Sequence, residues 1–223
     1  MTAALVVVVI GGAGVDTNAY TTADLAPGDP GHAAGVETHF VRVRDYVGQT
    51  GGFASRLYAA LGKRVAYVGG VGDDALGGLV RATLAGDGVD LSAVTVDPAG
   101  TSRSVNLMTA DGRRTSYYDG RGASTYQPAR ALVEPLVARA RLAHVAIVDW
   151  ARHLLPALRA RGVTVAVDVQ DVAAADDAYR QDFVDAADVL FLSAARLPEP
   201  GALAAVVAAY QRRNPRALCV AGL

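Results

Sequence analysis

Short, uninterrupted runs of apolar residues recur along the chain, separated by segments with helical periodicity. The runs fall at Ala4–Ile10, Val65–Gly70, Leu142–Val148, Thr164–Asp168, Val189–Ser193 and Ala217–Ala221. Runs without polar alternation are typical of strands that are covered on both faces, as in a parallel sheet. The later runs follow one another at intervals of roughly 20 to 25 residues, the length of a βαβ unit. The pattern predicts a doubly wound α/β fold with a mostly parallel sheet.

Helices are expected between these runs. Asp73 is placed to cap a helix with one apolar face that ends near Gly86. Pro128 stands where the first turn of a second helix would begin. A third helix is expected from about Gly201 to Tyr210. Each predicted helix connects two predicted strands, as the α/β interpretation requires.

Two segments break this rhythm and alternate between polar and apolar residues. Residues 17–48 include the alternating stretch Glu37–Arg44, and residues 103–118 indicate a hairpin with Ala110-Asp111-Gly112 at its turn. Alternation predicts that each segment has one solvated face. We therefore expect a single domain over residues 1–223, with a small β-strand lid formed by residues 17–48 and 103–118 inserted in it.

Composition narrows the classes of partner. The formal net charge is −1 and no basic run occurs, so we expect no nucleic-acid partner. No apolar stretch approaches the roughly 20 residues that cross a bilayer, so we expect no membrane partner. One cysteine, Cys219, leaves no internal disulfide and fits a reducing compartment, which favours a cytoplasmic protein. The four histidines are scattered without metal-ligand spacing, so we expect no metal site from them.

The exit of the first predicted strand carries the strongest candidate for chemistry. It reads Gly11-Gly12-Ala13-Gly14-Val15-Asp16-Thr17, and Thr17 replaces the third glycine of a dinucleotide fingerprint. A Rossmann-type site is therefore disfavoured. What remains is Asp16, a carboxylate at the sheet edge where open α/β sheets bind ligands. Asp16 is either a ligand of substrate hydroxyls or a turn-forming residue.

Other residues are candidates for the same ligand-binding edge of the sheet. Gly51 and Gly52 open a predicted helix and would let a ligand approach its N-terminus. The tight turn Gly72-Asp73-Asp74 is acidic where a phosphate would sit, which predicts a capped turn. Three more aspartates follow predicted strands: Asp149, Asp168 and Asp171. They either point into the same crevice or serve as solvated loop and cap residues.

Together these motifs resemble the PfkB (ribokinase-like) family of sugar and nucleoside kinases. The resemblance is carried by Gly-x-x-x-x-Asp after strand one, the Gly51-Gly52 helix start, Val-Gly-x-Val-Gly-Asp-Asp-x-x-Gly ending at Gly77, and the hairpin Thr101–Arg113. It implies a ribokinase-like α/β body with a β lid, and transfer of phosphate from ATP to a hydroxyl. It also implies ATP and Mg²⁺ as cofactors, a small sugar or nucleoside as partner, and a homodimer formed through the β lid.

The resemblance also implies roles for individual residues. Asp16 matches the residue that binds substrate hydroxyls. Gly51 and Gly52 match the glycines of the substrate loop, and Arg103 would lie on a lid strand over the substrate. Arg56 stands where the family usually has asparagine. Since arginine cannot accept a hydrogen bond, either the substrate is anionic or Arg56 pairs with a carboxylate such as Asp16.

Other family motifs are altered or missing. Ser193 and Arg196 stand in place of the asparagine and glutamate of a motif that supports magnesium handling, and no Gly-Ala-Gly-Asp segment, which would hold the catalytic base, occurs. The family places that segment beyond the run Arg216–Leu223. We therefore identify no catalytic residue, and expect a C-terminally incomplete fold with incomplete ATP and Mg²⁺ sites. Two functions stay open: the substrate side and lid of a kinase, or a non-catalytic sugar- or nucleoside-binding remnant of one.

Overall fold

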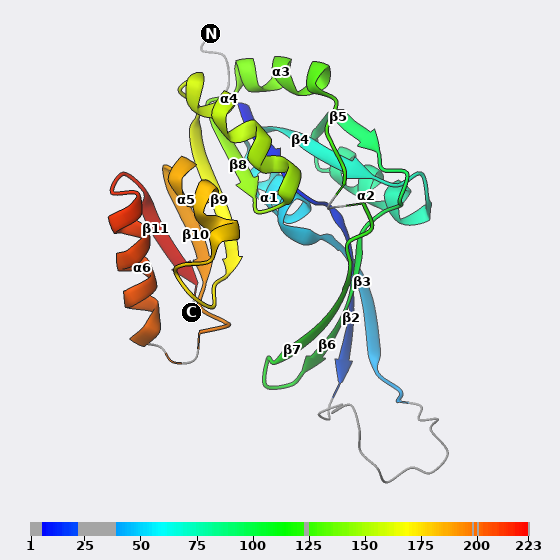
Figure 1. Cartoon of the computed structure of the whole chain (residues 1–223). Coiled ribbons are helices and arrows are strands. Elements are labelled where there is room, and N and C mark those ends of the chain that lie inside the picture. Colours follow the sequence, from blue (N-terminus) through cyan, green and yellow to red (C-terminus); the bar gives the residue numbers. More distant parts are fainter. Residues whose placement is uncertain (1–5, 22–38, 123–124, 198, 200, 223) are drawn as a thin grey trace.

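A seven-stranded parallel sheet forms the body of the protein, and a four-stranded sheet projects from it (Figure 1). The computed structural model describes residues 6–21, 39–122, 125–197, 199 and 201–222. The strands of the body are β1 (Val6–Ile10), β4 (Arg64–Val71), β5 (Asp90–Val96), β8 (Leu142–Ala146), β9 (Thr164–Asp171), β10 (Val189–Ser193) and β11 (Leu218–Gly222). They are ordered β11-β10-β9-β8-β1-β4-β5, and every neighbouring pair is parallel. The predicted α/β fold is confirmed, although the edge strand β5 was not predicted.

Helices cover both faces of this sheet. The helices are α1 (Gln49–Ala60), α2 (Ala75–Gly86), α3 (Arg130–Arg139), α4 (Leu155–Ala160), α5 (Gln181–Ala186) and α6 (Gly201–Arg213), with 3-10 turns η1 (Asp149–Leu154) and η2 (Ala178–Arg180). Alternate residues of β1 serve two separate cores. Val7 and Val9 pack with the α1 and α2 side, whereas Val8 and Ile10 pack with the α3 to α6 side. This two-sided burial explains why the strands are continuous apolar runs.

The start of α2 differs from the prediction by one residue. Asp74, not Asp73, is the N-cap, and its Oδ1 accepts a hydrogen bond from the Gly77 amide at 2.7 Å. The same carboxylate accepts from the amide and the hydroxyl of Thr101 at 2.8 and 2.7 Å. The pKa of Asp74 lies below its usual value because of these hydrogen bonds, and the bond from the Thr101 amide has the largest effect. Asp74 therefore ties the start of α2 to the segment that leads into the lid.

The four-stranded sheet contains the described parts of both segments that the sequence predicts to form a lid, and we keep that name for it. Its strands are β2 (Gly14–Thr21), β3 (Arg42–Gly48), β6 (Arg103–Thr109) and β7 (Arg114–Asp119), in the order β3-β2-β6-β7. β2 follows β1 after three residues, so the lid begins at Gly14 rather than at residue 17. Residues 22–38 of the predicted lid lie outside the described part. β6 and β7 form the predicted hairpin, and β2 pairs with β6 in parallel.

Strand alternation gives the lid two chemically different faces. We call the face that carries Asp16, Asn18, Ser104, Asn106, Ser116 and Tyr118 the inner face, since strand pairing places these residues side by side. The outer face carries Thr17, Ala19, Val43, Val105, Leu107 and Tyr117. The inner face carries mainly polar side chains, whereas the outer face combines these apolar residues with the charged residues Asp45 and Arg103. The alternating sequence pattern therefore separates two surfaces, as predicted.

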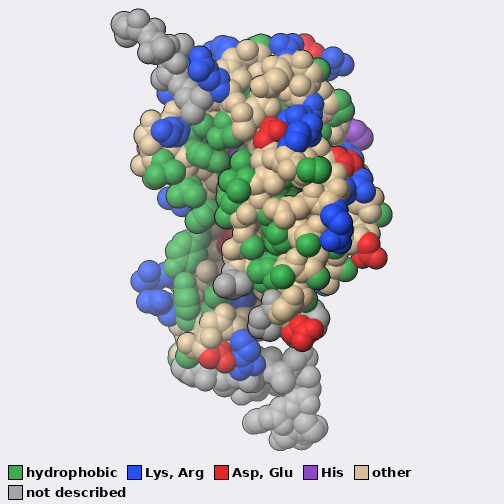
Figure 2. Space-filling model, turned by 90° about the vertical axis from the view of Figure 1, so that its left-hand side faces the viewer, with side chains coloured by type: hydrophobic (Ala, Val, Ile, Leu, Met, Phe, Trp, Pro, Cys, Tyr) green, Lys and Arg blue, Asp and Glu red, His purple; other side chains and the backbone are tan. Residues whose placement is uncertain are grey.

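β11 forms one edge of the large sheet. Its Leu218 and Val220 side chains are 63% and 41% exposed. Figure 2 looks at the molecule from the side of β11 and α6 and shows hydrophobic side chains in a band through the middle of that surface. No helix within the described residues is long and apolar enough to cross a membrane.

Candidate substrate site

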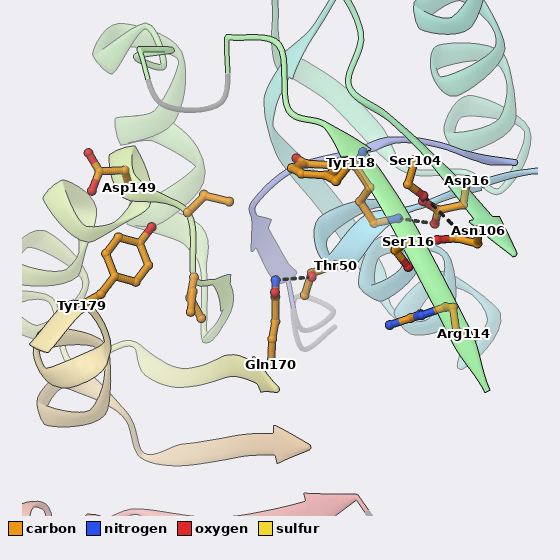
Figure 3. Close-up of a pocket in the computed structure, with 14 residues that line it drawn as sticks. Asp16, Thr50, Ser104, Asn106, Arg114, Ser116, Tyr118, Asp149, Gln170 and Tyr179 are labelled. Atoms are coloured by element: carbon orange, nitrogen blue, oxygen red, sulfur yellow. Dashed lines mark hydrogen bonds between the residues drawn. The ribbon is translucent and has the colours of Figure 1, made fainter. Parts of the chain in front are cut away.

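A cavity of about 680 Å³ lies between the lid and the carboxyl ends of the body strands (Figure 3). Its lid side is lined by Asp16, Ser104, Asn106, Arg114, Ser116 and Tyr118. Its body side is lined by Gly12, Gln49, Thr50, Ile147, Val148, Asp149, Gln170 and Tyr179. The body residues follow β1 or β8, lie near the end of β9, begin α1 or belong to η2, so the cavity sits at the sheet edge where open α/β folds bind ligands.

Asp16 lies in strand β2 with its carboxylate at the base of this cavity. Its Oδ2 accepts a hydrogen bond from the Gln49 amide at 3.1 Å, and its Oδ1 accepts one from the Ser104 hydroxyl at 2.5 Å. A turn-forming role does not apply, because Asp16 is paired on both sides within the lid sheet. Each carboxylate oxygen has more than one lone pair, so both oxygens keep capacity for hydroxyl donors of a ligand.

Two glutamines with left-handed backbones line the floor of the cavity. Gln49 has φ of 59° and Gln170 has φ of 57°, a conformation uncommon for residues other than glycine. The Gln170 Nε2 donates to the Thr50 hydroxyl at 2.8 Å, which joins the end of β9 to the start of α1 (Figure 3). The Gln49 Oε1 accepts from the Ser102 hydroxyl at 2.9 Å, while its buried Nε2 has no partner among the described residues. Strained backbone of this kind gathers at binding sites.

Gly51 and Gly52 serve the packing of α1 against the strand exit. Their amides both donate to the Gly12 carbonyl, at 2.8 and 3.2 Å. A Cβ atom on Gly51 would lie 2.7 Å from that carbonyl oxygen, so only glycine fits. The space that the sequence suggested for a ligand is therefore taken by the chain itself. The neighbouring Gln49 and Thr50 line the cavity in their place.

Arg103 lies on the outer face of the lid, so its predicted place over the substrate is wrong by one residue. Its Nη2 donates to the Thr17 hydroxyl at 3.0 Å, and Thr17 donates in turn to Asp45 at 2.5 Å. Neighbouring strand residues point to opposite faces, so Ser104 holds the position over the cavity. Sequence alone does not determine which face of the lid a residue of β6 occupies, because the face depends on which residues pair with β2.

Arg56 does not pair with Asp16. Its Nε lies 2.6 Å from the Asp87 carboxylate, at the end of α2, and its Nη1 donates to the Val47 carbonyl at 3.4 Å. Arg56 is also not among the residues that line the cavity. The contacts therefore give Arg56 a role in joining α1 to α2, and they provide no support for contact with an anionic substrate.

The three crevice aspartates have different surroundings. Asp149 lines the cavity and lies 3.2 Å from Arg152. Asp168 and Asp171 do not line it. Burial raises the pKa of Asp168, although its Oδ1 accepts a hydrogen bond from the Gln170 amide at 2.8 Å. Asp168 therefore supports the left-handed turn of Gln170 rather than meeting a ligand.

Comparison with known proteins identifies the fold family. Residues 7–200 match the family profile described as pfkB family carbohydrate kinase. The chain belongs to the PfkB family. The resemblance read from the glycine and aspartate motifs is thereby confirmed. The acarbose 7(IV)-phosphotransferase of Actinoplanes sp. is 37% identical over 199 residues, covering 88% of this chain and 63% of that protein. This PfkB chain thus spans less than two thirds of that relative's length.

Solved structures agree with this assignment. A microbiome-derived acarbose kinase has a TM-score of 0.79 and 33% identity over 100% of this chain and 70% of its own. The Arabidopsis thaliana ribokinase complexed with ribose and ATP has a TM-score of 0.73 at 21% identity, over 99% of this chain and 73% of its own, a likeness of fold. Both structures therefore share the fold of this PfkB chain.

Residues that could hold ATP or Mg²⁺ are harder to identify in this chain than residues that line the cavity. Within the described part of the chain, no group of three or more His, Cys, Asp or Glu side chains could hold a metal ion. The sequence also contains no Gly-Ala-Gly-Asp segment. Among the described residues, these two observations identify no side chains that would hold Mg²⁺ or the ATP phosphates.

Proposed function

We propose that this chain forms the sugar-binding side and lid of an ATP-dependent carbohydrate kinase. The observation that carries the proposal is the Asp16 carboxylate, held by Gln49 and Ser104 at the base of a polar cavity. Two relatives at 37% and 33% identity act, by name, on acarbose, which favours a sugar over a nucleoside as the substrate. ATP supplies the phosphoryl group in this reaction, and a sugar hydroxyl accepts it.

The residues of this chain would contribute positioning. Asp16 accepts hydrogen bonds from two neighbouring hydroxyls of the sugar, one on each carboxylate oxygen. Thr50 and Gln49 border the same ring from the start of α1, and the lid closes over it and excludes water. Holding the acceptor hydroxyl in one orientation is a large part of phosphoryl transfer, which needs little covalent help from the protein.

Calorimetric titration of the chain with acarbose, ribose and fructose tests the binding role. Asp16→Asn should weaken binding by roughly tenfold or more, because a hydrogen bond to a charged group is worth about 1.5–3 kcal/mol. Asp45→Asn is the matched control, since Asp45 lies on the neighbouring strand β3 and its side chain is on the outer face of the lid. Equal affinity of Asp16→Asn and the parent for every sugar would refute the role of Asp16.

A second candidate function is sugar binding without catalysis. It is favoured by Ser193 and Arg196, which stand in place of the asparagine and glutamate of the family motif for magnesium handling. Measuring ADP production with each sugar that binds separates the two functions. Sugar-dependent ADP production supports the kinase, whereas binding with no ADP production supports the non-catalytic module.

We further propose that two copies of the chain associate through the outer faces of their lids in the cytoplasm. Val43 and Tyr117 are each 56% exposed there, and Val105 is 37% exposed. Exposed apolar patches of this kind mark interaction surfaces. Val43→Arg should shift a dimer to monomer in light scattering after size exclusion, whereas Arg44→Ala on the inner face should not. A monomeric parent chain would contradict the proposal.

A further inference from the structure

The polar wall of the cavity continues along the lid well beyond Asp16. Asn106 is only 6% exposed, yet it lines the cavity two residues further along β6 than Ser104. Its Nδ2 donates to the Asn18 Oδ1 at 2.8 Å and to the Ser104 hydroxyl at 3.1 Å. Both amide hydrogens are thereby engaged, so the group that Asn106 offers a ligand is its carbonyl oxygen, an acceptor.

The next residues outward on the inner face are Ser116 and Arg114 of β7. Ser116 pairs with Asn106, Arg114 pairs with Met108, and both Ser116 and Arg114 line the cavity (Figure 3). A serine hydroxyl donates or accepts, and an arginine only donates. Along the wall, Asn106 therefore offers an acceptor, Ser116 a hydroxyl that donates or accepts, and Arg114 a donor. This succession suits a ligand rich in hydroxyls.

The length of this wall exceeds the needs of one sugar ring. Ser104 and Met108 are four residues apart on β6, a rise of about 13 Å at roughly 3.3 Å per residue. A six-membered sugar ring is roughly as wide as the spacing between neighbouring strands, about 4.8 Å. A ring held at Asp16 would extend no further than Asn106, whose amide is joined to Asp16 through Ser104, and would leave Arg114 without contact.

The remaining walls suit a neutral, extended saccharide. Tyr118 on the lid and Tyr179 on the body side line the cavity, and their side chains are 59% and 41% exposed. Tyrosine rings combine an apolar face with a polar tip, as do sugar rings. The charged groups lining the cavity are Asp16, Asp149 and Arg114, so neither sign dominates.

We propose that the inner face of the lid is a row of saccharide subsites and that the substrate has at least two sugar rings. The first ring lies at Asp16, a placement that rests on the proposed function. A second ring lies against Asn106 and Ser116, and Arg114 donates hydrogen bonds to its outer hydroxyls. Arg114 and Ser116 thus determine the preference for chain length.

The test is calorimetric titration of the chain with glucose, maltose and maltotriose, alongside ribose and fructose. Affinity should rise about tenfold or more from one ring to three, the equivalent of one hydrogen bond to a charged group. The double variant Arg114→Ala/Ser116→Ala should lose that gain and keep the affinity for single rings. The matched control is Arg103→Ala/Thr115→Ala, which removes neighbouring side chains from the outer face.

The possible outcomes distinguish a failure of the subsites from a failure of the proposed function. Equal affinity of the parent for single sugars and for maltotriose would overturn the subsites while leaving the proposed function intact. No binding of any saccharide would overturn the proposed function and the subsites with it. A loss of ATP affinity in the double variant, with an unchanged dependence on ring number, would assign Arg114 to the nucleotide and overturn its role here.

Discussion

The α/β body and the lid are both built from strands, yet they use their side chains differently. In the body, both faces of each central strand are apolar and buried, as with Val7, Val8, Val9 and Ile10 of β1. In the lid, one face is polar toward the cavity, and the other carries exposed apolar side chains such as Val43, Val105 and Tyr117. We therefore expect stability to be concentrated in the body and, under the proposed function, recognition in the lid. Substitutions that separate the two properties test this division.

The largest effect is expected from the core of the body. Leu190→Ala removes a fully buried side chain from β10 and should lower the free energy of unfolding by about 2–5 kcal/mol. Urea denaturation measures this change. Leu218→Ala, on the 63% exposed edge position of β11, is the control and should cost much less. A similar loss from both would contradict a core centred on β10.

The pH dependence of stability should also come from the body. His144 lies against Tyr58 and Phe191, and burial lowers the pKa of His144 from 6.5 to about 4. The unfolded chain therefore takes up a proton between these values while the folded chain does not, so stability falls as pH is lowered through that window. The slope approaches about 1.4 kcal/mol per pH unit.

His144→Gln should flatten this slope in urea denaturation between pH 6.5 and 4. The exposed His153 provides the matched control, because His153→Gln should leave the slope unchanged. A slope that persists in His144→Gln would assign the pH dependence to other groups.

A smaller effect is expected where body and lid are joined. Asp74→Ala removes the cap of α2 and the bonds to Thr101, so it should lower the free energy of unfolding by about 1 kcal/mol, within the 0.5–2 kcal/mol range for caps. Asp73→Ala, at the exposed neighbouring position, should change thermal unfolding little. Equal losses from both variants would argue against the cap.

The smallest effect is expected from Arg56. Its ion pair with Asp87 joins two side chains that are 40% and 34% exposed, and such pairs contribute about 0–1 kcal/mol. Arg56→Ala should therefore lower the melting temperature slightly and leave sugar affinity unchanged. A tenfold loss of sugar affinity would restore Arg56 to the substrate site and break the separation between body and lid.

The sequence predicted the body better than the lid. Two-sided burial leaves continuous apolar runs, so six of the seven body strands could be located from those runs alone, including Val189–Ser193 at its observed bounds. Asp16 could be proposed from the sequence because it follows a buried strand and a glycine-rich turn, which are recognisable patterns. The family resemblance pointed to Arg103, whereas Ser104 lines the cavity, because the face of a lid residue is decided by pairing with strands far away in the sequence. Gln49 and Gln170 were missed because no local signal marks a glutamine with a left-handed backbone.

The parallel pairing of β2 with β6 has a consequence for folding kinetics. Asp16 and Ser104 are 88 residues apart in the chain, and α1, β4, α2 and β5 lie between their strands. Closing so long a loop is entropically costly until the intervening elements have packed and brought the strand ends together. The binding face should thus assemble late, and variants in the intervening body helices should slow its appearance even when they lie far from the cavity.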